Sequence, residues 1–90
     1  MAERAKSDLT LEVEAEQRLL LKAEADIEAG WTRLRRQEDL VGWLRSAGHE
    51  TGEAERLVEL MKCSLLEWER HRVLIEQRVA YLRAKCAGLP

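Results

Sequence analysis

Apolar residues recur in this chain at alternating steps of three and four along most of its length. This spacing places them on one side of a helix, as in coiled coils, so we call each series a seam. The sequence therefore predicts an all-α fold of two long helices, each with one apolar side. The first seam comprises Leu20, Ala23, Ile27, Gly30, Leu34, Gln37, Val41 and Leu44, and the second comprises Ala54, Val58, Met61, Leu65, Trp68, Arg72, Ile75, Val79, Leu82 and Cys86.

The stretch AGHETGEA, residues 47–54, separates the two seams. Gly48 follows the first seam closely, where a helix commonly ends in a left-handed residue that glycine adopts without strain. Thr51 is placed to cap the second helix by accepting a hydrogen bond from a free backbone N–H. A link this short makes neighbouring helices antiparallel, with His49 and Glu50 on its exposed outside.

Facing seams in an antiparallel hairpin pair residues whose numbers have a constant sum. The pairs 41 and 58, 34 and 65, 27 and 72, and 20 and 79 each total 99. The interleaved pairs 37 and 61, 30 and 68, and 23 and 75 each total 98. This register sets Gly30, the smallest seam residue, opposite Trp68, the largest, as expected where small and large side chains alternate across a helical core. We therefore expect Gly30 and Trp68 to pack together.

The composition agrees with long amphipathic helices. Of the 90 residues, 46% are apolar and 36% charged, with no Phe and one Pro. No apolar run approaches the roughly 18 residues of a membrane span, and the N-terminus lacks the apolar core of a signal peptide. We therefore expect no membrane partner, a cytoplasmic location and reduced cysteines. The net charge of -2 argues against a dedicated binder of polyanions.

We expect one domain over residues 1–90, with a first helix over about 8–47, a bend at 48–51 and a second helix over about 52–87. Two points stay open. Gly30 costs about 1 kcal/mol relative to Ala in a helix and would also suit a kink. The segment LTLEVEAE, residues 9–16, alternates as a strand does, although no partner strand is visible and Glu and Ala favour helix.

Apolar residues spill beyond both seams, which is typical of helices that face more than one neighbour. We therefore predict a homodimer of hairpins, an antiparallel four-helix bundle, with a different protein as the alternative partner. Trp43 and Leu21 point away from the seam and suit contacts with such a protein. The candidate interface residues are Trp31, Leu40, Trp43, Leu60, Leu66, Val73, Leu74 and Tyr81.

Two polar residues, Gln37 and Arg72, occupy seam positions. Arg72 either extends past Ile27 toward Glu24 or Glu28, or acts with Gln37 to fix register and oligomeric state, as single polar seam residues do in coiled coils. These two residues are also the sole motivation for a third hypothesis, a small helical enzyme.

No residue set predicts catalysis, a cofactor or a metal. The His49 region lacks a nucleophile and the second histidine of the HExxH zinc motif. The chain has no CxxC, and Cys63 lies about 35 Å along the helix from Cys86, too far for a disulfide. We expect Cys86 to be a small core residue and Cys63 a partly exposed thiol.

Basic residues cluster in RLRRQ, residues 33–37, and in ERHR, residues 69–72. Acidic residues stand nearby, so we expect an internal ion-pair network; they are Glu38, Asp39, Glu67 and Glu69. The competing hypothesis is a nucleic-acid-associated or transcription-linked accessory protein. Such binders usually carry a clearer basic stripe and a recognisable module, so nucleic acid is disfavoured as a partner.

The run from residue 25 to residue 75 resembles a group of short uncharacterised bacterial helical-hairpin proteins. The resemblance covers a little over half of the chain and implies a bacterial cytosolic hairpin with no known activity or ligand. From the wide apolar stripe we expect a non-enzymatic, self-associating interaction or regulatory module. The matching positions are Ile27, Gly30, Arg36, Gln37, Leu40, Val41, Gly48, His49, Thr51, Ala54, Leu57, His71 and Arg72.

Overall fold

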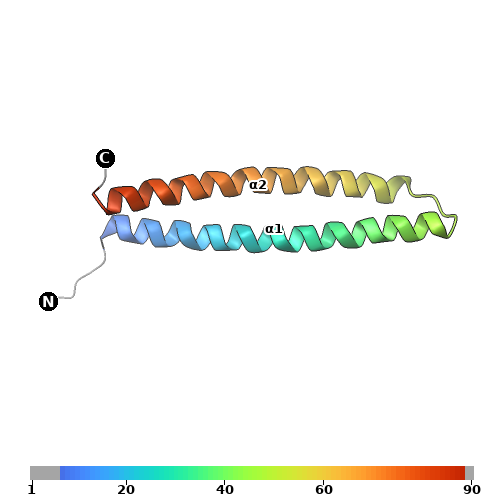
Figure 1. The fold of residues 1–90 in the computed structure, drawn as a ribbon, viewed down its shortest axis with the longest axis horizontal. Coiled ribbons are helices and arrows are strands. Elements are labelled where there is room, and N and C mark those ends of the chain that lie inside the picture. The colour runs from blue at the N-terminus through green and yellow to red at the C-terminus, as the bar shows by residue number, and fades with distance from the viewer. Residues whose placement is uncertain (1–6, 89–90) are drawn as a thin grey trace.

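The computed structural model describes residues 7–88 as two helices, α1 (Asp8–Ser46) and α2 (Gly52–Cys86). They lie side by side and antiparallel, with the bend at one end and the start of α1 beside the end of α2 at the other (Figure 1). The Cα atoms span 72 × 27 × 13 Å, so the hairpin is a single layer of two helices. The predicted all-α fold of two packed helices is confirmed. Residues 1–6 and 89–90 of the expected domain lie outside the described residues.

Helix α1 runs unbroken through the two places where the sequence also allowed a strand or a kink. Residues 9–16 are helical, and the helix continues past Gly30 without interruption. Ser7 begins it by accepting a hydrogen bond from the backbone N–H of Thr10 at 3.1 Å, which satisfies one free donor of the first turn. A capped start therefore extends the helix well before the predicted seam begins at Leu20.

The bend ends α1 as its glycine predicts. Gly48 has a φ of 79°, its N–H donates to the carbonyl of Arg45, and the His49 N–H donates to that of Leu44. These two hydrogen bonds form a Schellman motif. Thr51 is the N-cap residue of α2 as expected, but the expected capping hydrogen bond is absent, because no backbone N–H donates to its side chain. The Thr51 hydroxyl instead donates to the carboxylate of Glu55 at 2.5 Å.

The buried residues follow the predicted seams and extend them. Val13 lies fourteen residues before Ile27 and carries the same spacing to the start of α1. None of the described side chains is less than 2% exposed, so the interior is one thin stripe rather than a closed core. The buried apolar residues are Val13, Ile27, Leu34, Val41, Val58, Leu65, Ile75, Val79 and Leu82.

Charge along the two helices matches the antiparallel arrangement. Residues 8–30 hold seven acids and two bases, and lie beside residues 69–86, which hold five bases and two acids. Residues 31–46 hold four bases and two acids, and lie beside residues 52–68, which hold four acids and two bases. At both ends of the hairpin, a segment with excess negative charge therefore lies beside a segment with excess positive charge. In a parallel arrangement, the two acidic segments, residues 8–30 and 52–68, would lie side by side. Neither described helix is long and apolar enough to span a membrane.

Candidate interaction surface

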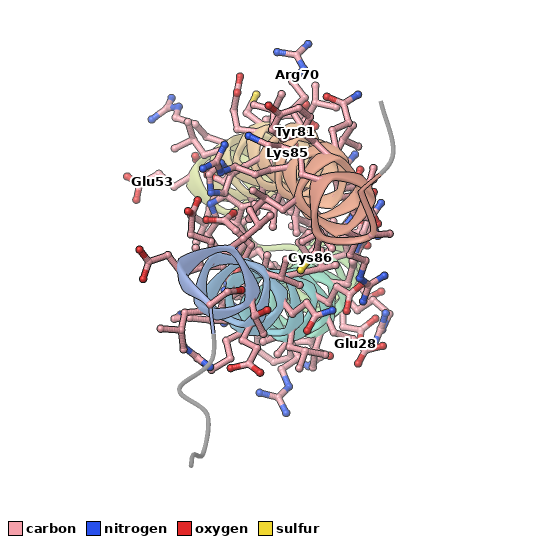
Figure 2. The ribbon with its side chains drawn as sticks, turned by 90° about the vertical axis from the view of Figure 1, so that its left-hand side faces the viewer. Glu28, Glu53, Arg70, Tyr81, Lys85 and Cys86 are labelled. Carbon is pink, nitrogen blue, oxygen red and sulfur yellow. The ribbon has the colours of Figure 1, made fainter. Side chains whose placement is uncertain are left out.

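The single-layer hairpin has two broad faces, one on each side of the plane that contains both helices. Viewed along the helix axes, Glu53 and Glu28 project to opposite sides (Figure 2). Each face carries a shallow groove between the helices that contains one tryptophan, Trp68 or Trp31. We name the faces after these residues, the Trp68 face and the Trp31 face.

The groove of the Trp68 face exists because Gly30 has no side chain. A Cβ atom at residue 30 would lie 2.7 Å from Cδ2 of Leu65 and 3.1 Å from Cζ3 of Trp68. The predicted contact between Gly30 and Trp68 is therefore present, with Leu65 approaching even more closely. The groove has a volume of about 240 Å³, and Leu57, Leu60 and Arg33 also line it. Its character is apolar with one basic edge.

Heptad spacing extends the Trp68 face in both directions from this groove. Residues seven apart lie on nearly the same side of a helix, since seven residues make almost two turns. Leu40 and Leu19 are seven and fourteen residues from Arg33, and Leu74 and Tyr81 are fourteen and twenty-one from Leu60. The exposed large apolar side chains of the Trp68 face are Leu19, Leu40, Trp43, Leu57, Leu60, Trp68, Leu74 and Tyr81.

Carboxylates dominate the grooves of the Trp31 face. A groove of about 350 Å³ is lined by Glu24 and Glu28 together with Trp31 and Arg72. A second groove of about 200 Å³, nearer the bend, is lined by three glutamates, Glu38, Glu55 and Glu59. The exposed large apolar side chains on this side, placed by the same spacing, are Leu21, Trp31, Leu66 and Val73.

The sequence therefore predicts most of these interface residues, but as one surface rather than two. The structure places Leu40, Trp43, Leu60, Leu74 and Tyr81 on the Trp68 face. It places the remaining predicted interface residues, Trp31, Leu66 and Val73, on the other side. Three residues outside that prediction join the Trp68 face: Leu19, Leu57, and the seam residue Trp68, which is 39% exposed. Position within the heptad was the signal that could have separated the two sets.

The two polar seam residues behave differently. Gln37 crosses the hairpin, and its Nε2 donates to the backbone carbonyl of Ala54 at 3.1 Å. This bond joins α1 to the first turn of α2 and favours one register. Arg72 lies in the same groove as Glu24 and Glu28, and its buried Nε has no hydrogen-bond partner. Arg72 thus reaches the groove of these glutamates, as one of the two alternatives expects, but among residues 7–88 the structure records no ion pair for it.

Beside the bend, two side-chain pairs lie on opposite faces. The rings of Trp43 and His49 are 5.8 Å apart at 31°, so the exposed His49 ring borders the Trp68 face. On the other face, Glu55 accepts the Thr51 hydrogen bond and lies 2.6 Å from Nη2 of Arg45. The Thr51 hydrogen bond, with a smaller contribution from the Arg45 charge, holds the pKa of Glu55 below its ordinary value of 4.5.

The expected ion-pair network around the basic clusters is wrong in most of its members. Arg70 pairs with Glu67 at 3.3 Å, but Arg33 lies over the Trp68 ring at 6.0 Å, and Arg35 donates to Thr32. In the described part of the chain, no ion pair involves Arg33, Arg35 or Arg36. Arg33 thus contributes its guanidinium to the Trp68 groove rather than to a neighbouring carboxylate.

The two cysteines are both exposed, which corrects the expected burial of Cys86. Its side chain does point toward α1, with Sγ 3.6 Å from Oγ1 of Thr10 (Figure 2). It stays accessible because it is the last residue of α2, at the open end of the hairpin. Within residues 7–88, no three His, Cys, Asp or Glu side chains gather as a metal site would require.

Comparison with known proteins adds no relative: no family model, curated protein or solved structure matches this chain. The resemblance to bacterial helical-hairpin proteins therefore stays a prediction.

Proposed function

We propose that this chain is a non-catalytic interaction module that associates with a second copy of itself through the Trp68 face, forming an antiparallel four-helix bundle. The observation that carries the proposal is the imbalance of apolar residues. Among residues 7–88, nine apolar side chains are buried between the helices, whereas thirteen large ones are exposed. Eight of those thirteen lie on the Trp68 face.

Both energetics and geometry support this partner. A chain of this size has a marginal core, and burial contributes about 25 cal/mol per Å² of apolar surface removed from water. A standard interface covers about 800 Å² on each partner. The broad face, with Cα extents of 72 by 27 Å, is large enough for that area. Because two copies present the same surface, a twofold dimer covers the Trp68 face of both copies. No part of that surface is then left to bind further copies and form filaments.

Sedimentation equilibrium of the full chain at micromolar concentration tests the proposal, with two variants matched in type and exposure. Leu60 lies on the Trp68 face and is 59% exposed, and Leu66 lies on the Trp31 face and is 53% exposed. We expect Leu60→Glu to weaken dimerisation about 100-fold, because a charge is buried in the interface, and Leu66→Glu to change it by less than about threefold. A wild-type monomer, or equal effects of the two variants, would contradict the proposal.

Nucleic-acid association is the second candidate, and one observation favours it. Arg33, Arg35 and Arg36 are exposed, and no carboxylate within residues 7–88 forms an ion pair with them. Phosphate contacts by such residues strengthen as salt is lowered. A mobility shift of DNA or RNA at low ionic strength that disappears in the Arg35→Gln/Arg36→Gln variant would support this function. Absence of any shift would remove it.

A further inference from the structure

We infer that the two copies stack with their bends at the same end, each α1 lying over the α2 of the partner subunit. This inference rests on the proposed self-association through the Trp68 face. A twofold dimer of hairpins has two options, bends together or bends at opposite ends. Both keep neighbouring helices antiparallel, so the choice depends on how the Trp68 face is composed along its length.

The face is most apolar near the bend, where Glu53 lies at its edge, and more charged toward the open end. Four exposed apolar side chains, Leu40, Trp43, Leu57 and Leu60, lie within about 15 Å of the bend along the helices. We call them the bend quartet. Farther along, heptad spacing from Arg36, Arg33 and Ser64 places Lys22, Asp26, Arg78 and Lys85 among the remaining apolar residues.

Stacking the bends together makes each bend quartet face the other. Arg45 and Glu55 are at the same height in one hairpin, and their numbers total 100. The same total across the interface pairs Trp43 with Leu57 of the partner subunit and Leu40 with Leu60 of the partner subunit. Eight large apolar side chains then form one cluster without an intervening charge. Energetically important residues pair in this way across interfaces.

The charged part of the face is compatible with the same stacking. The total of 100 pairs Arg33 with Glu67 of the partner subunit, which are opposite in charge. It also brings Lys22 toward Arg78 of the partner subunit, the one like-charge pair. That repulsion is offset within each hairpin, because Lys22 lies 2.8 Å from Asp26 and Arg78 lies 3.5 Å from Glu12 and 3.8 Å from Glu16.

Stacking with bends at opposite ends pairs fewer large apolar side chains across the interface. A twofold axis near Gly30 and Trp68 would cover the bend quartet with the open-end half of the partner subunit. Leu60 would then face Arg78 of the partner subunit, and Arg36 would face Lys22 of the partner subunit. Each arrangement sets one kind of charged side chain against an apolar one, which costs desolvation free energy, because bends-together stacking places Asp26 against Leu74 of the partner subunit. Opposite-end stacking keeps one apolar pair of the bend quartet, Leu57 with Tyr81 of the partner subunit. Bends-together stacking is favoured because it alone holds both bend quartets in one cluster.

A distance between spin labels at Cys86 separates the two arrangements. The Cys63→Ser variant of the full chain leaves Cys86 as the single labelling site, exposed and at the open end. With bends together, the two nitroxides lie within about 30 Å, since packed helices are about 10 Å apart. With bends at opposite ends, they are separated by nearly the length of α2, about 50 Å.

Pulsed dipolar measurement at a concentration where sedimentation gives a dimer completes the test. A distance near 50 Å overturns the orientation and leaves self-association standing. A monomer mass without a dipolar distance overturns both proposals. The Cys86→Ser variant labelled at Cys63 is the matched control, because Cys63 lies nearer the middle of α2 and gives a short distance in either orientation. We expect short distances from both labels.

Discussion

The Trp68 face and the Trp31 face are made by the same two helices, yet they differ in what lies between the helices. On the Trp68 face the groove has Gly30 as its floor and leucines and Trp68 as its walls. On the Trp31 face the grooves are lined by five glutamates and an arginine whose Nε lacks a partner. The difference shows that heptad position alone can give the two sides of a two-helix layer different characters, one apolar and the other acidic.

Filling the floor of the Trp68 groove is expected to have the largest effect on hairpin stability. In Gly30→Leu, the new side chain meets Leu65, which is 3% exposed and has little room to move. We expect the free energy of unfolding to fall by about 1–3 kcal/mol, as in other overpacked cores, measured by urea denaturation at fixed protein concentration. An unchanged or raised midpoint would mean that the helices separate freely at this point, and the described groove would lose its structural basis.

On the Trp31 face, removing the polar part of Arg72 is expected to stabilise the hairpin. Arg72→Met keeps the packed aliphatic chain and eliminates the buried Nε that lacks a partner. We expect the free energy of unfolding to rise by about 1 kcal/mol, with Arg72→Lys as the control that retains charge. A loss of stability in Arg72→Met would show that Arg72 pairs with Glu24 or Glu28 in solution.

Gly42 offers the counterpart of Gly30 in the same helix. It lies on the side of Glu28, fourteen residues further on, and a Cβ there would meet nothing within 4 Å. Gly42→Ala is therefore expected to gain helix propensity without a clash and to raise the free energy of unfolding by about 0.5–1 kcal/mol. The same denaturation assay measures it. We expect Gly30→Ala to raise the free energy of unfolding less than Gly42→Ala does, because α2 approaches Gly30 closely. An equal increase in both variants would contradict that close approach.

The smallest expected effect concerns Glu55 on the Trp31 face. Its pKa is lowered in the folded hairpin, so the interaction with Thr51 and Arg45 stabilises the fold above pH 4.5 and is lost as the pH falls below that value. Carboxyl NMR titration should give a pKa below 4.5 in the wild type. In Thr51→Val, which removes the largest contribution, the pKa should return toward 4.5. An identical titration in both proteins would contradict the assigned cause.

Much of the hairpin was predictable because local chemistry and periodicity act along a single helix. Gly48 ends α1 through its left-handed φ, and the seam spacing alone predicts the contact between Gly30 and Trp68. The cap of α2 was not predictable in the same way. The Thr51 hydroxyl donates to the Glu55 carboxylate and accepts no hydrogen bond from a backbone N–H, because a hydrogen bond to a charged acceptor is the stronger of the two.

The members of the candidate surface were predicted, whereas their division between two faces was not, although heptad position in the sequence carries that division. Trp31 and Leu60 look alike in the sequence, because each flanks a seam with an apolar side chain. Their separation onto opposite faces depends on which side of the plane of both helices each one occupies. The exposure of Cys86 likewise depends on its place at the open end rather than on its seam position.

By itself the sequence determined two helices, their antiparallel pairing and the spacing of their contacts, because periodicity and charge order are properties of the chain alone. Only the tertiary structure decided how near Leu65 comes to Gly30, how exposed Cys86 is, and which polar groups find partners. These features depend on the rotation and separation of one helix relative to the other. Such quantities arise from packing two surfaces together and have no counterpart in either helix taken separately.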